Sequence, residues 1–233
     1  MRAAQTWAAA LLLWAAAASV QAAPQRVSAQ YQLLKDGQPV AVVDETFTRS
    51  GDRYRIESET KGVGIFALLV KGSVRLVSSG EVTKKGLRPL HFEHHRGADP
   101  ARTIYADFDW QTNSLDLRHD GATETVALQP GSQDRLSLMY QFMFLRRRPA
   151  DLVFYMTNGK KLDQYRYRRV GVETLTTPAG PLRTLHYSRQ HEPDEDGTEV
   201  WLAMDRHYFP VRVLIEEKDG GTLEQTLTRL DIE

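Results

Sequence analysis

The residues best suited to metal or acid–base chemistry lie in one segment, His91-Phe92-Glu93-His94-His95. Side chains two positions apart in a β-strand share a face, so His91, Glu93 and His95 would point the same way. Two imidazoles and a carboxylate are ligands that zinc accepts, but a zinc site needs further ligands, and the sequence nominates none. The same pattern is typical of the polar outer face of a half-buried strand. We therefore predict no metal site.

Paired carboxylates are the second group that could do chemistry. Asp107 and Asp109 would share a strand face and could suit acid–base work in a cleft, although a solvated strand face has the same pattern. The chain has no cysteine, no G-x-S-x-G serine motif, no Walker loop and no G-x-G-x-x-G segment. Nucleophilic catalysis and a nucleotide-binding domain are therefore not indicated. We predict no catalytic residue and no cofactor.

Two basic segments raise the question of a polyanionic partner. Residues 165–169, YRYRR, alternate aromatic and cationic side chains, and residues 146–148 are three arginines. The first pattern fits a strand with its tyrosines inward, and the second fits a helix C terminus, where cations complement the helix dipole. The chain has 30 Lys and Arg against 30 Asp and Glu, without the excess of positive charge that a nucleic-acid binder needs. We predict no nucleic-acid partner.

The elements that must position these residues are mostly strands. Segments with a period of two alternate with turn signals such as Asp36-Gly37 and Asp219-Gly220, which favour tight hairpins. Serial hairpins build an antiparallel meander, since parallel strands need long crossovers. An open meander leaves unpaired edges, so we expect it to curl into a barrel or half-barrel. The predicted strands are residues 28–34, 40–48, 53–60, 74–83, 87–95, 103–110, 114–119, 123–128, 151–156, 161–173, 182–190, 198–204, 211–218 and 222–231.

Two segments interrupt the strand pattern. Residues 132–148 have apolar side chains at helical spacing; Ser132 or Asp134 can cap the start, and Pro149 ends the segment. This helix is apolar on more than one side, so we predict that it is buried inside the concave face of the curled sheet. Residues 62–72 are apolar between two glycines and predict a second short helix, or a lid that closes one end of the barrel.

The N-terminal segment predicts export. Arg2 supplies a positive charge, residues 7–18 are apolar, and Val20-Gln21-Ala22 resembles a small-residue cleavage site. The apolar run of 12 residues is shorter than the about 20 residues of a spanning helix. We expect a signal peptide over residues 1–22 cleaved near Ala22, one β-rich domain over residues 23–233, no transmembrane span in the mature chain, and a periplasmic location.

Two segments carry a resemblance to a known family. Residues 133–144, QDRLSLMYQFMF, and residues 199–212, EVWLAMDRHYFPVR, are similar to the DUF3108 family of exported bacterial proteins of unknown function. The resemblance extends from residue 28 to the C terminus and implies no activity and no site residue. The β pattern also resembles the architecture of lipoprotein-localisation factors, in which a half-barrel wraps helices and an apolar cavity. Shared architecture alone does not assign a function.

These features favour a non-catalytic binding or carrier module for a lipid-like or amphiphilic ligand. The two non-strand segments have a surplus of flexible apolar residues, and Met139, Phe142, Met143 and Phe144 are of the kind that makes adaptable apolar contacts. The first alternative is a structural module of the cell envelope that docks an envelope protein, and the second is an envelope hydrolase. The residues predicted to contact the ligand are Ile65, Phe66, Leu69, Met139, Phe142, Met143, Trp201, Tyr208 and Arg212.

Overall fold

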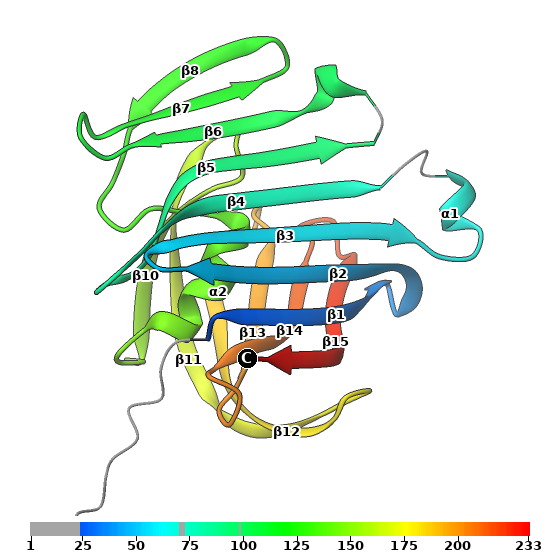
Figure 1. Ribbon diagram of the computed structural model, residues 1–233. Helices are drawn as coiled ribbons and strands as arrows, with labels where there is room; N and C mark the ends of the chain where they lie inside the picture. Colours follow the sequence, from blue (N-terminus) through cyan, green and yellow to red (C-terminus); the bar gives the residue numbers. More distant parts are fainter. Residues whose placement is uncertain (1–23, 70–72, 98) are drawn as a thin grey trace, which may run out of the picture.

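One large antiparallel sheet makes up most of the protein. The computed structural model describes residues 24–69, 73–97 and 99–233, and the predicted signal peptide lies outside the described residues. Fifteen strands form a single sheet in the order β8-β7-β6-β5-β4-β3-β2-β1-β15-β14-β13-β12-β11-β10-β9 (Figure 1). Neighbouring strands are antiparallel, except that β9 and β10 run parallel. The predicted antiparallel meander is therefore confirmed.

Every predicted strand is present, with ends that differ from the prediction by at most four residues, and the short strand β9 was not predicted. The elements in chain order are β1 (Arg26–Lys35), β2 (Gln38–Ser50), β3 (Arg53–Gly62), α1 (Phe66–Leu69), β4 (Val74–Thr83), β5 (Gly86–Arg96), the 3-10 turn η1 (Pro100–Arg102), β6 (Ile104–Asp109), β7 (Ser114–His119), β8 (Ala122–Ala127), β9 (Gln133–Asp134), α2 (Arg135–Phe144), β10 (Asp151–Thr157), β11 (Leu162–Thr177), β12 (Gly180–Gln190), β13 (Gly197–Ala203), β14 (Phe209–Glu216) and β15 (Thr222–Ile232).

Tight turns and one long-range pair give the sheet its shape. Asp36 and Gly37 both have positive φ angles, 50° and 76°, as a two-residue hairpin turn between β1 and β2 requires. Pairing of β1 with β15 joins the two ends of the described chain. Figure 1 shows the sheet curling so that β1–β8 form one wall and β10–β15 form a second wall across from it, with α2 between them. The sheet begins at β8 and ends at β9, so the predicted half-barrel around one buried helix is confirmed.

Helix α2 is shorter than the predicted 132–148 segment at both ends. It starts later because Gln133 and Asp134 pair with β10 instead. Asp134 is the N-cap: its Oδ1 accepts the backbone N–H groups of Leu136 (2.9 Å) and Ser137 (2.8 Å). The helix ends at Phe144, so the three arginines follow it instead of forming its last turn.

Aromatic side chains pack α2 against both walls. On one side Tyr140 packs against Phe47 and Phe209, with both ring pairs 5.5 Å apart. On the other side Phe142 packs against Phe154 and Tyr187. Such ring pairs add to the stabilisation that burial of their surface provides. The helix therefore links the two walls through a shared core.

Asp134 also connects α2 to the sheet, since its Oδ2 accepts the hydroxyl of Ser78 on β4 at 2.6 Å. We predict that Asp134→Ala lowers the free energy of unfolding by about 2 kcal/mol, because it removes the cap and leaves the buried Ser78 hydroxyl without this acceptor. Urea unfolding would measure the change. Asp134→Asn is the matched control: its amide oxygen can still cap the helix, so its loss should be smaller. Equal losses in the two variants would contradict the capping role.

Candidate functional site

The candidate site lies on the concave face of the sheet, which is the face turned toward α2. Strand alternation identifies the side chains on this face. In β5 the buried Phe92 packs in the core, so His94 and Arg96 share its side of the sheet. In β4 the partners of His94 and Arg96 are Leu76 and Val74. These four residues extend the concave face beyond the helix N terminus.

Apolar side chains on this part of the concave face are not fully covered. They come from both walls and from α2, and they are half-buried, whereas the core residues around the aromatic clusters are buried. An apolar side chain that faces the inside of a curled sheet and still contacts water marks a part of the core that the chain does not fill. We call this region the open end; its apolar residues are Leu33, Val74, Leu76, Met139, Met156, Val213, Ile215 and Leu223.

The strand pairing places open-end residues of neighbouring strands opposite or next to one another. Leu33 on β1 lies opposite Gln225 on β15, and Gln225 in turn lies opposite Val213 on β14. Ile215 and Leu223 form the next pair on the same face. Apolar side chains therefore line this face on β1, β15 and β14, with the polar Gln225 between Leu33 and Val213.

Two arginines project into the open end. Arg135 is the first residue of α2, and it lies on the same helix edge as Met139 and Met143, four and eight positions later. Solvent reaches its side chain, yet the surrounding protein desolvates the guanidinium and, together with the nearby charge of Arg96, lowers its pKa. Within the described part of the chain, neither Arg96 nor Arg135 makes a side-chain hydrogen bond or an ion pair.

One acidic group that acts on Arg135 is Glu45 on β2, which is buried and hydrogen-bonded. Ser58 Oγ and the Tyr140 hydroxyl donate to its carboxylate at 3.2 and 3.3 Å, and Gln225 adds a further hydrogen bond. Burial raises the pKa of Glu45 to about 7, against the opposing effect of these hydrogen bonds. Glu45 is therefore partly protonated at neutral pH and compensates the arginines only in part.

His94 shares the concave face with the two arginines. Burial, and then the positive charges of Arg135 and Arg96, lower its pKa to about 4. Its Nδ1 atom is buried without a hydrogen-bond partner among the described residues. His94 is therefore uncharged at neutral pH, and the positive charge of the open end comes from the arginines.

Sequence reasoning missed Arg96 and Arg135, although a signal for each was present. Arg96 continues the alternation of Phe92 and His94, and Arg135 precedes Met139 by one helical turn. Recognising them required knowing which face of β5 is concave and which helix edge is left uncovered. Neither property is local.

The predicted ligand contacts on the two helices lie in different surroundings. Met139 borders the open end, Met143 is half-buried further along the same edge, and Phe142 is fully buried in the core. Ile65, 69% exposed, precedes α1, and Phe66 is half-buried at its first position. Leu69 is the last residue of α1, and its side chain lies outside the described part of the structure.

The predicted contacts of the second motif lie away from the open end. Trp201 is 5% exposed and belongs to the core cluster that includes Phe209, whereas its neighbours Val200 and Leu202 belong to the second core cluster. Trp201 stacks on His186 at 4.2 Å and carries the Arg212 guanidinium over its ring at 4.6 Å. Tyr208 is not part of this stack; the Arg148 guanidinium lies 3.5 Å from its ring centre. The nine predicted residues therefore do not form one site.

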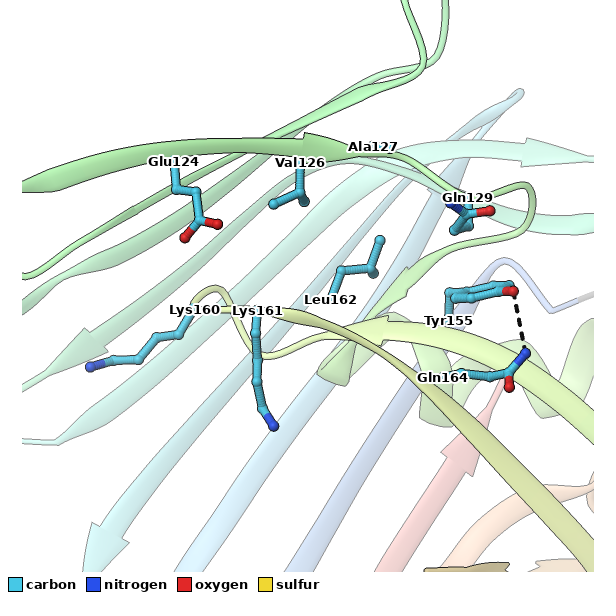
Figure 2. Close-up of a pocket in the computed structure, with 9 residues that line it drawn as sticks. All are labelled: Glu124, Val126, Ala127, Gln129, Tyr155, Lys160, Lys161, Leu162 and Gln164. Atoms are coloured by element: carbon cyan, nitrogen blue, oxygen red, sulfur yellow. Dashed lines mark hydrogen bonds between the residues drawn. The ribbon is translucent and has the colours of Figure 1, made fainter.

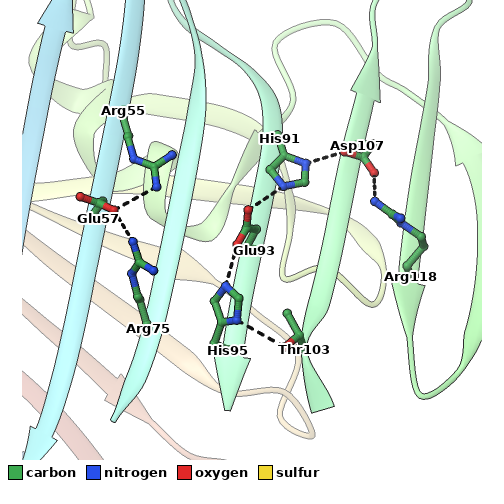
Figure 3. Close-up of polar contacts among 9 residues, drawn as sticks. All are labelled: Arg55, Glu57, Arg75, His91, Glu93, His95, Thr103, Asp107 and Arg118. Atoms are coloured by element: carbon green, nitrogen blue, oxygen red, sulfur yellow. Dashed lines mark hydrogen bonds and ion pairs between the residues drawn. The ribbon is translucent and has the colours of Figure 1, made fainter. Parts of the chain in front are cut away.

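The histidine segment forms a charged network on the outer face, shown in Figure 3. His91, Glu93 and His95 do share a face, as predicted. Glu93 bonds both imidazoles, at 3.0 Å to His91 Nε2 and 2.6 Å to His95 Nε2. Burial tends to raise the pKa of Glu93, but the hydrogen bonds from the two histidines outweigh it and lower the pKa.

The remaining ring nitrogens of this network are also engaged. His91 Nδ1 contacts Asp107 at 2.5 Å, and His95 Nδ1 contacts the Thr103 hydroxyl at 3.3 Å. Among the described residues, no group of three or more histidine, cysteine or acidic side chains is arranged to hold a metal ion. The network is best explained as charge pairing across neighbouring strands.

A groove of about 370 Å³ lies between β8 and the β10–β11 hairpin (Figure 2). Its lining combines opposite charges, Glu124 with Lys160 and Lys161, and a hydrogen bond from Gln164 to the Tyr155 hydroxyl at 3.2 Å. The sequence analysis did not identify this groove. Mixed charges and amides of this kind select no single ligand chemistry, so we place the candidate site at the open end.

The raised pKa of Glu45 predicts a pH-dependent stability. The carboxyl has a pKa of 4.5 when exposed and about 7 in the fold, so its protonated form favours folding. This stabilisation is present below pH 4.5 and is lost as the pH rises through 7. We predict that the stability of the wild type relative to Glu45→Gln falls by about 3 kcal/mol between pH 4.5 and pH 8.

Urea unfolding of the two proteins across this pH range would check the prediction. His94 changes stability in the opposite direction between pH 4 and pH 6.5, since its pKa is lowered. That contribution is common to both proteins and cancels in the difference. A difference that does not vary with pH would show that Glu45 titrates normally.

Comparison with known proteins agrees with this architecture. A β-barrel-like protein of the DUF1849 domain of unknown function from Brucella abortus has a similar structure: TM-score 0.52, 9% identity, 90% of this chain and 98% of that chain covered. An exported protein with a YmcC-like fold from Bacteroides fragilis matches with a TM-score of 0.39 and 13% identity over 89% of this chain and 96% of the other. At these identities the likeness concerns the fold alone.

Two further findings bear on classification. No curated protein matches the sequence. Among the described residues, no helix has both the length and the apolar composition of a membrane-spanning segment. The family model of DUF3108, described as proteins of unknown function, matches residues 26–228, and the chain belongs to this family.

Proposed function

We propose that this protein is an exported, non-catalytic carrier that holds an amphiphilic molecule, such as a lipid or a single acyl chain, at the open end of the concave face. The observation that carries the proposal is the set of half-buried apolar side chains that face the inside of the curled sheet. Covering such surface is favourable, at about 0.8 kcal/mol for each buried methylene of a ligand. An acyl chain has the shape and chemistry to do this.

The composition of the lining supports a flexible ligand. Met139 from α2 and Met156 from β10 are both half-buried and pack against the same core cluster. Methionine side chains adjust to irregular apolar shapes, as a site for acyl chains requires. The predicted signal peptide supports a location outside the cytoplasm, in the periplasm.

The two alternative functions have weaker support. For a hydrolase, the strongest group is His91 with Glu93 and His95, and its imidazole nitrogens are already engaged on the outer face. For an envelope-docking module, the strongest feature is the exposed Ile65 beside α1. Ile65, Val153, Val170 and Val172 are exposed, and scattered exposed side chains are ordinary for a protein surface, whereas a group of uncovered apolar side chains on a concave face is not.

We predict that the purified protein binds an uncharged naphthylamine probe whose fluorescence rises in apolar surroundings. Leu76→Gln and Met139→Gln should each weaken binding by about 5- to 30-fold, because each places an amide in the apolar lining. Val153→Gln is the matched control, since Val153 is 49% exposed and alternates with the inward-facing Leu152 and Phe154. Fluorescence titration would give the dissociation constants, and circular dichroism would verify that each variant is folded.

The control should bind like the wild type. A wild-type protein that does not bind the probe, or variants that bind as tightly as the wild type, would argue against the carrier proposal. The docking module would then be the better explanation. Native mass spectrometry of the protein from a periplasmic extract offers an independent test, because a carrier is expected to retain a bound amphiphile.

A further inference from the structure

We infer that the amphiphile carries an anionic headgroup, a phosphate or a carboxylate, and that Arg96 and Arg135 bind it together at the inner side of the open end. The inference rests on the proposed function, because it assigns the headgroup of the ligand at the same site. It concerns two side chains that make no hydrogen bond or ion pair among the described residues.

The geometry brings the two guanidinium groups to one place from different elements. Arg135 begins α2, which Asp134 fixes to Ser78 of β4. Arg96 ends β5, the neighbour of β4, on the concave face opposite Val74. The two charges are close enough to act on each other and on His94, which lies between Arg96 and the core on the same strand face.

Some arginines of the sheet pair with carboxylates, whereas Arg166 and Arg169 on β11 make no ion pair among the described residues. On the outer face Arg75 pairs with Glu57 and Arg118 with Asp107; Arg212 pairs with Glu224 at 2.8 Å. No such carboxylate partner serves Arg96 or Arg135 among the described residues. Two like charges that face a partly desolvated space repel each other, and an anion between them would remove that repulsion.

The acidic side chains near the two arginines do not supply this anion. Asp134 uses one oxygen for the helix cap and the other for Ser78. Glu45 accepts hydrogen bonds from Ser58 and Tyr140 and is partly protonated at neutral pH. Because Asp134 already occupies the backbone N–H groups of the first helical turn, the anion would be held by the arginine side chains and not by the helix terminus.

The surroundings of the arginines favour a headgroup attached to an apolar chain over a free anion. Val74 lies directly opposite Arg96, and Leu76 follows on the same face; both are half-buried. Met139 lies one turn from Arg135 on the open-end edge of α2. A charged head at the arginines would therefore place its chain along the uncovered apolar lining.

The test measures displacement of the uncharged naphthylamine probe by three molecules with the same twelve-carbon chain. Dodecyl phosphate and laurate carry an anionic head, and monolauroylglycerol is uncharged. In the wild type, the two anions should compete about tenfold or more better than the uncharged lipid. Arg135→Gln and Arg96→Gln should each weaken competition by the two anions about tenfold to hundredfold more than they weaken competition by the uncharged lipid.

Arg166→Gln is the matched control, since it removes the same charge from an exposed position of β11. It should leave competition by all three molecules unchanged. Inorganic phosphate is the last competitor. At millimolar concentration it should neither displace the probe nor prevent the lipids from displacing it. Isothermal calorimetry with phosphate alone would check this expectation directly.

The outcomes separate the two proposals. Failure of the wild type to bind the probe would overturn the carrier function and this inference with it. Normal probe binding, with the anionic and uncharged lipids competing equally or with no effect of either arginine variant, would overturn the headgroup assignment alone. Strong binding of phosphate alone would instead indicate a site for a free anion and would also overturn the lipid assignment.

Discussion

The buried carboxylate of Asp134 is the constraint on which the rest of the structure depends. It caps α2, accepts the hydroxyl of Ser78 from one wall, and belongs to the short strand β9 that pairs with β10 of the other wall. A helix start fixed in this way cannot slide along the concave face. The packing of Tyr140 against Phe47 of one wall and Phe209 of the other, and of Phe142 against Phe154, follows from this placement, and so does the position of Arg135.

A second tie holds the helix to the beginning of β5. The backbone N–H of Leu87 donates to Gln141 Oε1 at 2.7 Å, and the Leu87 carbonyl accepts from Gln133 at 2.9 Å. Gly86 permits the close approach, because a Cβ at this position would lie 2.3 Å from the Gln141 oxygen. Polar hydrogen bonds thus hold one side of α2, and the opposite edge, with Arg135 and Met139, borders the open end.

Charged side chains are arranged differently on the two faces of the sheet. On the outer face opposite charges alternate across strands, as in the network of His91, Glu93 and Asp107 (Figure 3). Such exposed pairs contribute little to stability and chiefly keep the surface soluble. On the concave face the charged groups are few and partly desolvated, so each has a stronger effect on its neighbours, as the pKa of His94 shows.

The sequence by itself determined the local features of this protein. Period-two alternation and turn residues predicted the strands, helical spacing predicted α2, and Asp134 was one of two predicted caps, because these signals depend on neighbours within a few positions. Trp201, Tyr208 and Arg212 are close in sequence, but the tertiary structure separates them: Trp201 and Arg212 stack on each other, and Tyr208 packs against Arg148. Only the tertiary structure decided which face of each strand is concave, which apolar side chains the core leaves uncovered, and that Arg96 meets Arg135. The physical reason is that these properties depend on how the whole sheet curls around the helix, and strand pairs far apart in the sequence fix that curvature.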